Sequence, residues 1–255
     1  MNTDAYLRRI NYSGPLHPSP ETLRGLHLAH LLTVPFENLD IHLGRPIILE
    51  DAALFDKIVE RRRGGFCYEL NGLFCRLLRE LGFSASKLSA AVANPEGGFD
   101  PYFDHMALSV QLERLWLADV GFGDSFRQPL LLDEAGDQSA ESDDYAVERS
   151  GDELILMQRS QGDSGKPQYR FLLQPYEYAD YAEMCHFHQT SPKSPFTRGQ
   201  VCTLATSDGR ITLRDMRLIT TVRGDKHERL ISDQEERRNL LHDLFGIDLG
   251  DERSI

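Results

Sequence analysis

RRRGGFCYELNG, at positions 61–72, is the stretch that decides most about this chain. Its two glycines let the backbone turn sharply and let another group approach closely. A helix is predicted to begin directly after them, at Cys67, and to end near Leu81, where Gly82 is a natural helix stop. Apolar residues recur along it at the helical period, which indicates one buried face. They are Leu70, Leu73, Phe74, Leu77, Leu78 and Leu81.

Cys67 stands at the start of this helix, with three arginines just before it. The positive end of the helix dipole and nearby cations both favour a thiolate over a thiol. The position therefore predicts a nucleophilic cysteine, and the alternative is a packed core residue. Cys75 and Cys202 lie in apolar surroundings and are expected in the core.

Cysteine and histidine spacing gives little support for a metal. The segment Cys185–His188 carries two histidines in alternation, on what we expect to be an extended segment, and no further cysteine stands at ligand spacing. The sequence therefore predicts no metal site.

A catalytic thiolate needs a base, and the base needs an orienting group. His105 opens one strand-like run and Asp119 closes the next, and together the runs predict an antiparallel hairpin. If the turn centres on Leu112, the two residues lie directly opposite, with Cβ atoms about 4.5–5.5 Å apart. A slip of one residue would put them on opposite faces, so this register is a hypothesis. Asp119 could instead be a turn residue.

The order of elements predicts an α+β protein with segregated layers. Helices are expected from Pro20 until Pro35, from Asp51 to about Arg62, and from Cys67. Short strands follow, with an exposed acidic loop at Asp133–Asp144. After Tyr176 come further strands and a last helix, whose capping box is predicted at Ser232–Glu235. The strands are expected near Leu88–Val92, His105–Val110, Leu115–Val120, Val147–Arg149, Leu154–Gln158, Tyr169–Leu173, Val201–Ala205, Ile211–Arg214 and Leu218–Val222.

Composition excludes several classes of protein. With 28 Lys+Arg against 40 Asp+Glu, the formal net charge is −12, which argues against nucleic-acid binding and against docking on an anionic membrane. No apolar run has the length of a spanning helix, and the N-terminus lacks a signal-peptide core. Four cysteines without C-x-x-C pairing are too few for a disulfide scaffold. We therefore expect a cytoplasmic protein.

Four segments of the chain resemble the arylamine N-acetyltransferases, in the order found in that family. The segments VPFENL at 34–39 and SPKSPF at 191–196 match its outer motifs. The segments RGGFCYELN at 63–71 and DVGFG at 119–123 match its two most specific motifs. The resemblance covers nearly the full length of the chain.

This resemblance implies a catalytic triad of Cys67, His105 and Asp119. It also implies an N-terminal helical bundle (1–86), a central antiparallel β-barrel-like domain (87–175) and a C-terminal α/β lid (176–255). The core would be similar to that of papain-like cysteine enzymes.

The activity implied by the resemblance is acetyl transfer from acetyl-CoA, as co-substrate, to an arylamine, arylhydrazine or N-hydroxyarylamine by a ping-pong route. Phe36, Phe122 and Phe196 match family positions that line the acceptor pocket, although each could be an ordinary core residue. Glu37, Asn38 and Arg63 are expected to brace the turn before the nucleophile. The backbone N–H of Cys67 is one candidate oxyanion donor, and a second is not assigned.

The residues that bind coenzyme A are not identified by the sequence, which lacks the common phosphate-binding loops. Lys193 and the arginines at 61–63 are candidates for the phosphates. The nearest alternative function is a related amide synthase of secondary metabolism, which would keep the triad. A cysteine peptidase is disfavoured by the motifs around Cys67 and Asp119, and a non-catalytic binding protein by the intact triad.

Overall fold

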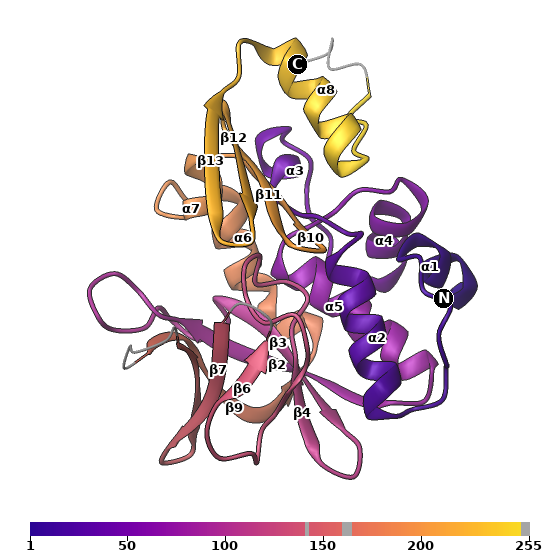
Figure 1. The fold of residues 1–255 in the computed structure, drawn as a ribbon, viewed down its shortest axis with the longest axis vertical. Helices are drawn as coiled ribbons and strands as arrows, with labels where there is room; N and C mark the ends of the chain where they lie inside the picture. Colours follow the sequence, from indigo (N-terminus) through magenta and orange to yellow (C-terminus); the bar gives the residue numbers. More distant parts are fainter. Residues whose placement is uncertain (141–142, 160–164, 251–255) are drawn as a thin grey trace.

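The computed structural model describes residues 1–140, 143–159 and 165–250 and is an α+β protein, as predicted (Figure 1). Helices from the first third of the chain lie on the right in that view. A curled eight-stranded sheet lies below and a five-stranded sheet above. Helix α5 packs against the eight-stranded sheet through β2 and β3. The predicted domain limits, 1–86, 87–175 and 176–255, remain a prediction, and β1 from the first part pairs with β10 in the third.

The first part of the chain is helical apart from one short strand. Ser19 caps α2 as predicted, since its Oγ accepts a hydrogen bond from the Thr22 N–H at 3.1 Å. Helix α5 begins at Cys67, also as predicted. The elements are α1 (Thr3–Arg9), α2 (Pro20–Leu31), β1 (Phe36–Glu37), α3 (Leu39–His42), α4 (Asp51–Phe55), η1 (Asp56–Glu60) and α5 (Cys67–Glu80).

The helix predicted from Asp51 to about Arg62 is only partly α-helical. The α-helix ends at Phe55, and Asp56–Glu60 forms a π-helix. In this π-helix the Lys57 side chain is buried, and its ammonium group binds two buried carboxylates. The hydrophobic periodicity of the sequence does not reveal a π-helix, because ion pairs with distant residues stabilise it. Turns of this kind are frequent near functional sites.

The eight-stranded sheet has the order β5-β4-β3-β2-β9-β8-β7-β6 and is nearly closed, like a barrel. The Gln138 side chain joins the two edge strands, since it accepts from the N–H of Leu131 at 2.7 Å and donates to the carbonyl of Leu131 at 2.8 Å. An amide side chain thus replaces a peptide unit in the ladder. The strands are β2 (Ser84–Val92), β3 (His105–Gln111), β4 (Leu115–Ala118), β5 (Leu130–Leu131), β6 (Gln138–Ala140), β7 (Asp143–Ser150), β8 (Glu153–Arg159) and β9 (Lys166–Tyr176).

The register expected for the hairpin of β3 and β4 is wrong by two residues. Gln111 pairs with Leu115 and Leu108 with Ala118, so the turn centres on Glu113 and not on Leu112. Asp119 therefore lies diagonally from His105 and not directly opposite. Because side chains alternate with a period of two, a slip of two residues keeps both on one face.

The loop expected at Asp133–Asp144 is interrupted by secondary structure. Gln138–Ala140 forms β6, and β7 begins at Asp143. Residues 141–142 lie outside the described residues. The acidic, polar composition of this segment does not predict the edge strand β6, because this strand is paired mainly through its backbone.

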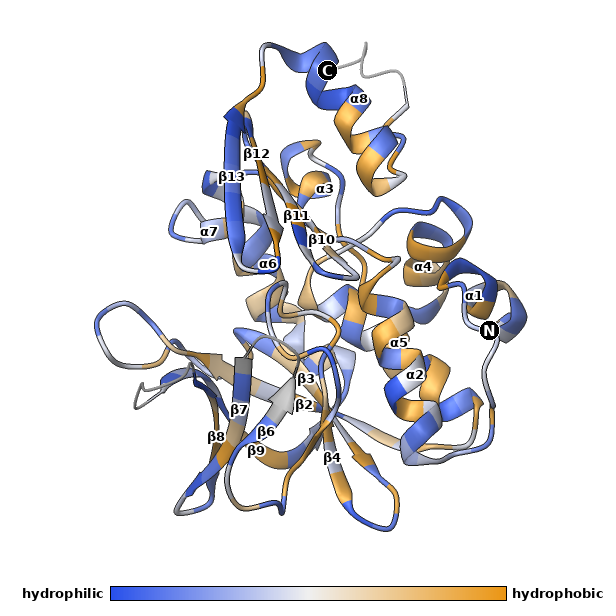
Figure 2. Cartoon of the chain, viewed as in Figure 1, coloured by the Kyte–Doolittle hydropathy of each residue, from blue (hydrophilic) through white to orange (hydrophobic). Residues whose placement is uncertain are grey.

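The third part of the chain contains a helix that the sequence analysis missed. The segment Cys185–His188 is not extended but lies inside α6. Strand β13 was also missed, because every residue in it is exposed and polar side chains dominate it, as its blue colour in Figure 2 shows. The elements are η2 (Tyr178–Tyr181), α6 (Ala182–Thr190), α7 (Pro195–Arg198), β10 (Val201–Thr206), β11 (Gly209–Arg214), β12 (Arg217–Val222), β13 (Asp225–Leu230) and α8 (Gln234–Phe245).

Helix α8 is capped one residue later than predicted. Asp233 is the N-cap and accepts a hydrogen bond from the Glu236 N–H at 2.9 Å. The Glu236 carboxylate accepts in return from the Ser232 N–H at 2.7 Å. In residues 1–140, 143–159 and 165–250, no helix is both long and apolar enough to cross a membrane.

Two histidines of α2 are buried in the core beneath α5. His30 packs against Tyr6 and Phe74, and neither of its ring nitrogens has a hydrogen-bond partner. Burial lowers the pKa of His27 to about 4 and lowers the pKa of His30 well below its ordinary value. Both imidazoles are therefore neutral in the folded protein at neutral pH.

We expect the free energy of unfolding to decrease as the pH falls from about 6.5 toward 4. In this range the unfolded chain takes up a proton at each histidine and the folded chain does not, so each contributes up to about 1.4 kcal/mol per pH unit. Urea denaturation at several pH values measures this slope. His30→Leu should reduce it by about one proton, and His17→Gln, at an exposed histidine, should leave it unchanged. Equal slopes for wild type and His30→Leu would contradict the prediction.

Candidate active site

Asp119 lies at the end of β4, and four donors hold its carboxylate. His105 Nε2 lies 2.7 Å from Oδ2, and the Tyr169 hydroxyl donates to the same oxygen at 3.0 Å. Asn71 Nδ2 and the Gly121 N–H donate to Oδ1 at 2.8 and 2.9 Å. Burial raises the pKa of Asp119, but His105 and these donors outweigh it, so the pKa lies below its ordinary value. The carboxylate is thus an anion in a fixed orientation.

His105 is oriented by this carboxylate. Its imidazole is buried, with the Phe122 ring edge-on at 5.1 Å between centroids and the Tyr169 ring at the same distance. Since Nε2 is bound to Asp119, Nδ1 is the nitrogen left for a second partner. The expected contact between His105 and Asp119 is therefore present, despite the shifted register.

Cys67 is the first residue of α5; one chain segment approaches it closely through a glycine, and another approaches the turn before it in the same way. A Cβ at Gly121 would lie 2.9 Å from the Cys67 Cα, so the DVGFG segment can pass this close only with glycine at that position. On the other side, a Cβ at Gly64 would lie 2.0 Å from the carbonyl oxygen of Pro35. These two contacts explain why the nucleophile motif and the DVGFG motif are rich in glycine.

The expected effect of the three arginines on Cys67 is wrong. Arg61 pairs with Asp56 at the surface, and Arg63 pairs with Glu37 and Asp40. Burial instead raises the pKa of the Cys67 thiol well above its ordinary value, and a hydrogen bond from the Met106 N–H opposes this only in part. A thiolate at this position therefore requires a proton acceptor beside it.

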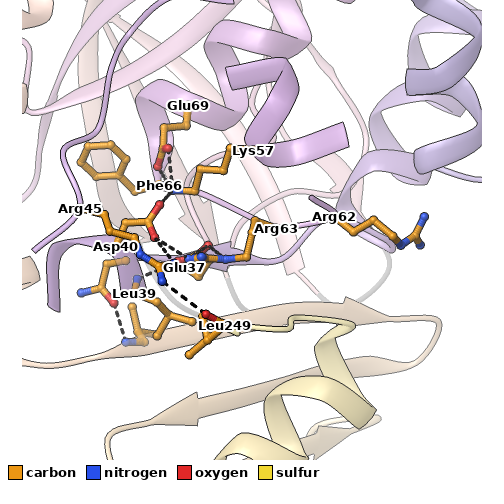
Figure 3. Close-up of polar contacts among 12 residues, drawn as sticks. Glu37, Leu39, Asp40, Arg45, Lys57, Arg62, Arg63, Phe66, Glu69 and Leu249 are labelled. Carbon is orange, nitrogen blue, oxygen red and sulfur yellow. Dashed lines mark hydrogen bonds and ion pairs between the residues drawn. The ribbon is translucent and has the colours of Figure 1, made fainter. Parts of the chain in front are cut away.

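A buried ionic cluster of Glu37, Asp40, Lys57, Arg63 and Glu69 lies behind the turn before Cys67 (Figure 3). The Lys57 ammonium lies 2.7 Å from both Asp40 and Glu69, and the Arg63 guanidinium binds Glu37 at 2.7 Å and Asp40 at 3.1 Å.

The second oxygen of Glu69 accepts from the N–H of Phe66, the residue before Cys67, at 3.0 Å. The cluster thus connects the first helices to the start of α5. This agrees with the expected bracing role of Glu37 and Arg63. Arg62 points away from the cluster in Figure 3.

Asn38 connects the helical part to the SPKSPF segment. Its Nδ2 donates to the carbonyls of Phe196 and Gly199 at 2.9 and 2.8 Å, and its Oδ1 accepts from the Val201 N–H at 2.8 Å. The side chain therefore fixes the backbone around Phe196 and not, as expected, the turn before Cys67.

A cavity of about 910 Å³ opens between the two sheets and α6, and the predicted site residues line it. Cys67 and His105 both lie on its wall, as do Phe36, Phe122 and Phe196. Asp119 lies behind His105 and is fully buried. The cavity therefore brings together a thiol, an imidazole backed by a carboxylate, and aromatic walls.

Charged side chains line other parts of the same cavity. Lys193, Arg214 and Lys226 are among them, whereas the arginines at 61–63 are not. Of the two positions considered for coenzyme A phosphates, only Lys193 therefore lies at the cavity.

The whole chain is similar to curated enzymes of one family. It is 34% identical to an arylamine N-acetyltransferase of Mycolicibacterium smegmatis, an alignment that covers 98% of this chain and 94% of the relative. Residues 19–254 match the family model described as N-acetyltransferase. The chain belongs to the arylamine N-acetyltransferase family. An arylamine N-acetyltransferase of Escherichia coli K12 is also 34% identical and covers 96% of this chain, with 89% of its own length aligned.

Solved structures of the family have the same fold. The arylamine N-acetyltransferase of M. smegmatis superposes with a TM-score of 0.91 at 34% identity, over 100% of this chain and 95% of that one. The Mycobacterium marinum enzyme in complex with CoA gives a TM-score of 0.89 at 34% identity, over 96% and 93%. The fold class predicted from the sequence is therefore confirmed.

Two residues that hold Asp119 were not predicted. Asn71 stands in the quoted nucleophile motif, four residues after Cys67, so the helical period places both on one face of α5. This spacing was a usable signal. Tyr169 lies in β9, fifty residues beyond Asp119, and only the pairing of β9 with β2 brings it close.

Proposed function

We propose that this chain is an acetyl-CoA-dependent arylamine N-acetyltransferase that carries the acetyl group on Cys67. The proposal rests on one observation above all: the Cys67 thiol and an Asp119-bound imidazole line the same aromatic-walled cavity. Membership of the family supports the acetyl donor and the amine acceptor. The relatives named above are arylamine N-acetyltransferases, which favours this function over the amide synthase.

In the proposed mechanism, Cys67 transfers its proton to the free nitrogen of His105 and attacks the thioester carbonyl of acetyl-CoA. The bond to the coenzyme A sulfur breaks, and the departing thiolate takes up the proton from His105. The acceptor amine then attacks the acetyl-cysteine, loses a proton to His105 and releases Cys67. Asp119 stabilises the imidazolium that forms in each half-reaction. Because burial raises the pKa of Cys67, the thiolate forms only together with this imidazolium.

The three phenylalanines suit an acceptor with an aromatic ring and one reactive nitrogen. The Phe36 and Phe196 rings lie 6.1 Å apart between centroids, and Phe122 packs edge-on against His105. Such rings favour offset or edge contacts with another aromatic ring and limit the access of water. We propose that they hold the arylamine or hydrazine beside the acetyl group.

The cationic side chains of the cavity suit the phosphates of coenzyme A. We propose that Lys193, Arg214 and Lys226 contribute to this site, since the rest of the chain is strongly acidic and phosphates require local cations. All four cysteines are free.

We expect ping-pong kinetics with an isolable acetyl-enzyme. Double-reciprocal plots against acetyl-CoA should be parallel at several arylamine concentrations, because coenzyme A leaves before the amine attacks. Without amine, intact-mass spectra should show one added acetyl group, which disappears when amine is supplied. The matched control is Cys67→Ser, which should show no amine-dischargeable acetyl group. Intersecting lines together with unmodified protein would mean direct transfer and would refute Cys67 as the carrier.

A further inference from the structure

The cavity holds a second imidazole–carboxylate pair, which no part of the proposed mechanism uses. His188 of α6 and Asp104, the residue before β3, both line it. His188 Nε2 lies 3.2 Å from Asp104 Oδ1. The His188 side chain is 2% exposed and that of Asp104 17%, so the carboxylate is the member of the pair that reaches the cavity.

The contacts of His188 place each of its ring nitrogens beside a different partner. Ser194 is fully buried, and its Oγ accepts from the Phe196 N–H at 3.2 Å. Its hydroxyl proton needs an acceptor, and His188 Nδ1 lies 3.2 Å away. In this arrangement the His188 proton is on Nε2, which lies 3.3 Å from the backbone carbonyl oxygen of Asp104 and 3.2 Å from its carboxylate Oδ1.

Asp104 is held close to the proposed nucleophile. The hydroxyl of Tyr68, the residue after Cys67, donates to the carbonyl oxygens of Phe103 and Asp104 at 2.5 and 3.2 Å. Phe103 has φ +70°, a left-handed conformation that is unfavourable for a residue with a Cβ. Asp104 is also the carboxylate whose charge acts most on the Cys67 thiol, ahead of Asp119. A strained but fixed turn thus presents an anion beside the acetyl-carrying sulfur.

The cationic side chains on the cavity wall come from other segments of the chain. Arg210 and Arg214 belong to β11 and Lys226 to β13, and Arg210 is paired with Asp124 at 3.0 Å. Lys193 lies between α6 and α7. Asp104 is instead held by its backbone carbonyl to the hydroxyl of Tyr68, the residue after Cys67, and both Asp104 and Cys67 line the cavity.

We propose that Asp104, positioned by His188, is a specificity-determining residue that accepts a hydrogen bond from the inner N–H of a hydrazine or hydrazide acceptor. The inference deepens the proposed function and rests on it. In such an acceptor the terminal NH₂ attacks the acetyl carbon, the C–S bond to Cys67 breaks, and the proton goes to His105. The adjacent N–H points away from the forming bond and is free to donate. A plain arylamine has no such donor next to its reacting nitrogen.

The test compares phenylhydrazine with 1-methyl-1-phenylhydrazine, which share the terminal NH₂ and differ in the inner N–H. The quantity measured is the ratio of their kcat/KM values. In Asp104→Ala this ratio should fall by about tenfold or more, since a hydrogen bond to a charged acceptor is lost. Asp104→Asn, which keeps an uncharged acceptor, should give an intermediate ratio. In a ping-pong reaction the kcat/KM value of each hydrazine reports only its reaction with acetyl-Cys67. A change in the reactivity of Cys67 affects both values equally and therefore cancels in their ratio.

Controls separate this role from general effects of charge and folding. Asp100→Ala removes another carboxylate from the cavity wall and should leave the ratio unchanged. His188→Gln, which can still donate to Asp104, should keep most of the preference, whereas His188→Leu should lose it.

If the Asp104 variants do not fold, the kcat/KM ratio of the wild-type enzyme for the two hydrazines tests the inference. This ratio is divided by the ratio of the rate constants with which the same two hydrazines react with a thioester without enzyme. A corrected ratio near one, or an unchanged ratio in Asp104→Ala, would overturn the inference and leave the proposed function intact. A wild-type enzyme that acetylates neither hydrazine nor any arylamine, and forms no acetyl-enzyme, would overturn the proposed function itself.

Discussion

Replacing Cys67 with serine is expected to reduce acetyl transfer by at least about 10⁴-fold while the protein still folds. A serine hydroxyl is far less acidic than a thiol, and in this buried position even the thiol has a raised pKa. His105 could therefore not generate a useful alkoxide concentration. The measurement is transfer from acetyl-CoA to an arylamine, with circular dichroism to verify folding.

Selective alkylation gives an independent test of the same residue. Cys67 is the only cysteine among the described residues that line the cavity, whereas Cys75 and Cys202 are buried in the hydrophobic cores. Iodoacetamide should therefore modify Cys67 first, and activity should be lost in proportion. Cys75→Ser is the control and should retain activity. Full activity in Cys67→Ser would refute the mechanism.

Lys57→Met is expected to have the largest effect on stability, a loss of about 3–5 kcal/mol in the free energy of unfolding. The ammonium group lies 2.7 Å from the carboxylates of Asp40 and Glu69, and all three side chains are at most 7% exposed. Its removal takes the paired cation from the buried Glu69 carboxylate and leaves Asp40 only its pairs with the two arginines, Arg45 and Arg63. Urea denaturation at pH 7 measures the loss.

The matched control is Arg61→Met, at a neighbouring pair with Asp56 in which both side chains are more than half exposed. Such a surface pair contributes at most about 1 kcal/mol. Burial already raises the pKa of Glu69, so protonation of this carboxylate should narrow the stability deficit of Lys57→Met as the pH falls toward 5. Equal losses for Lys57→Met and Arg61→Met would contradict the account of the buried cluster.

Local signals in the sequence were sufficient for the main helices and for the face of the hairpin. Ser19 and the glycines before Cys67 act on adjacent residues, so the starts of α2 and α5 follow from short-range chemistry alone. His105 and Asp119 share a face for a similar reason, since strand side chains alternate whatever the exact turn. The position of the turn between β3 and β4 depends on packing. Its centre is Glu113 and not the expected Leu112, and this difference of one residue shifts the strand pairing by two.

Other elements could not be predicted because distant residues stabilise them. The π-helix at Asp56–Glu60 accompanies the ion pairs of Lys57 with Asp40 and Glu69. Strand β13 has no buried residue, and it pairs with β12 through the backbone ladder and through an ion pair between Arg217 and Glu228. Helix α6 was not predicted, because the alternation of His186 and His188 by itself is typical of an extended segment.

The sequence by itself determined the family and the fold class, and it predicted the candidate triad, because Cys67 and Asp119 stand in contiguous motifs and His105 shares a strand face with Asp119. The tertiary structure alone decided the electrostatics of the site. It paired Arg63 with Glu37 and not with Cys67, brought Tyr169 to Asp119, and joined His188 to Asp104 across 84 residues of chain. Burial and charge pairing depend on which surfaces meet in space, and one-dimensional spacing does not specify these contacts.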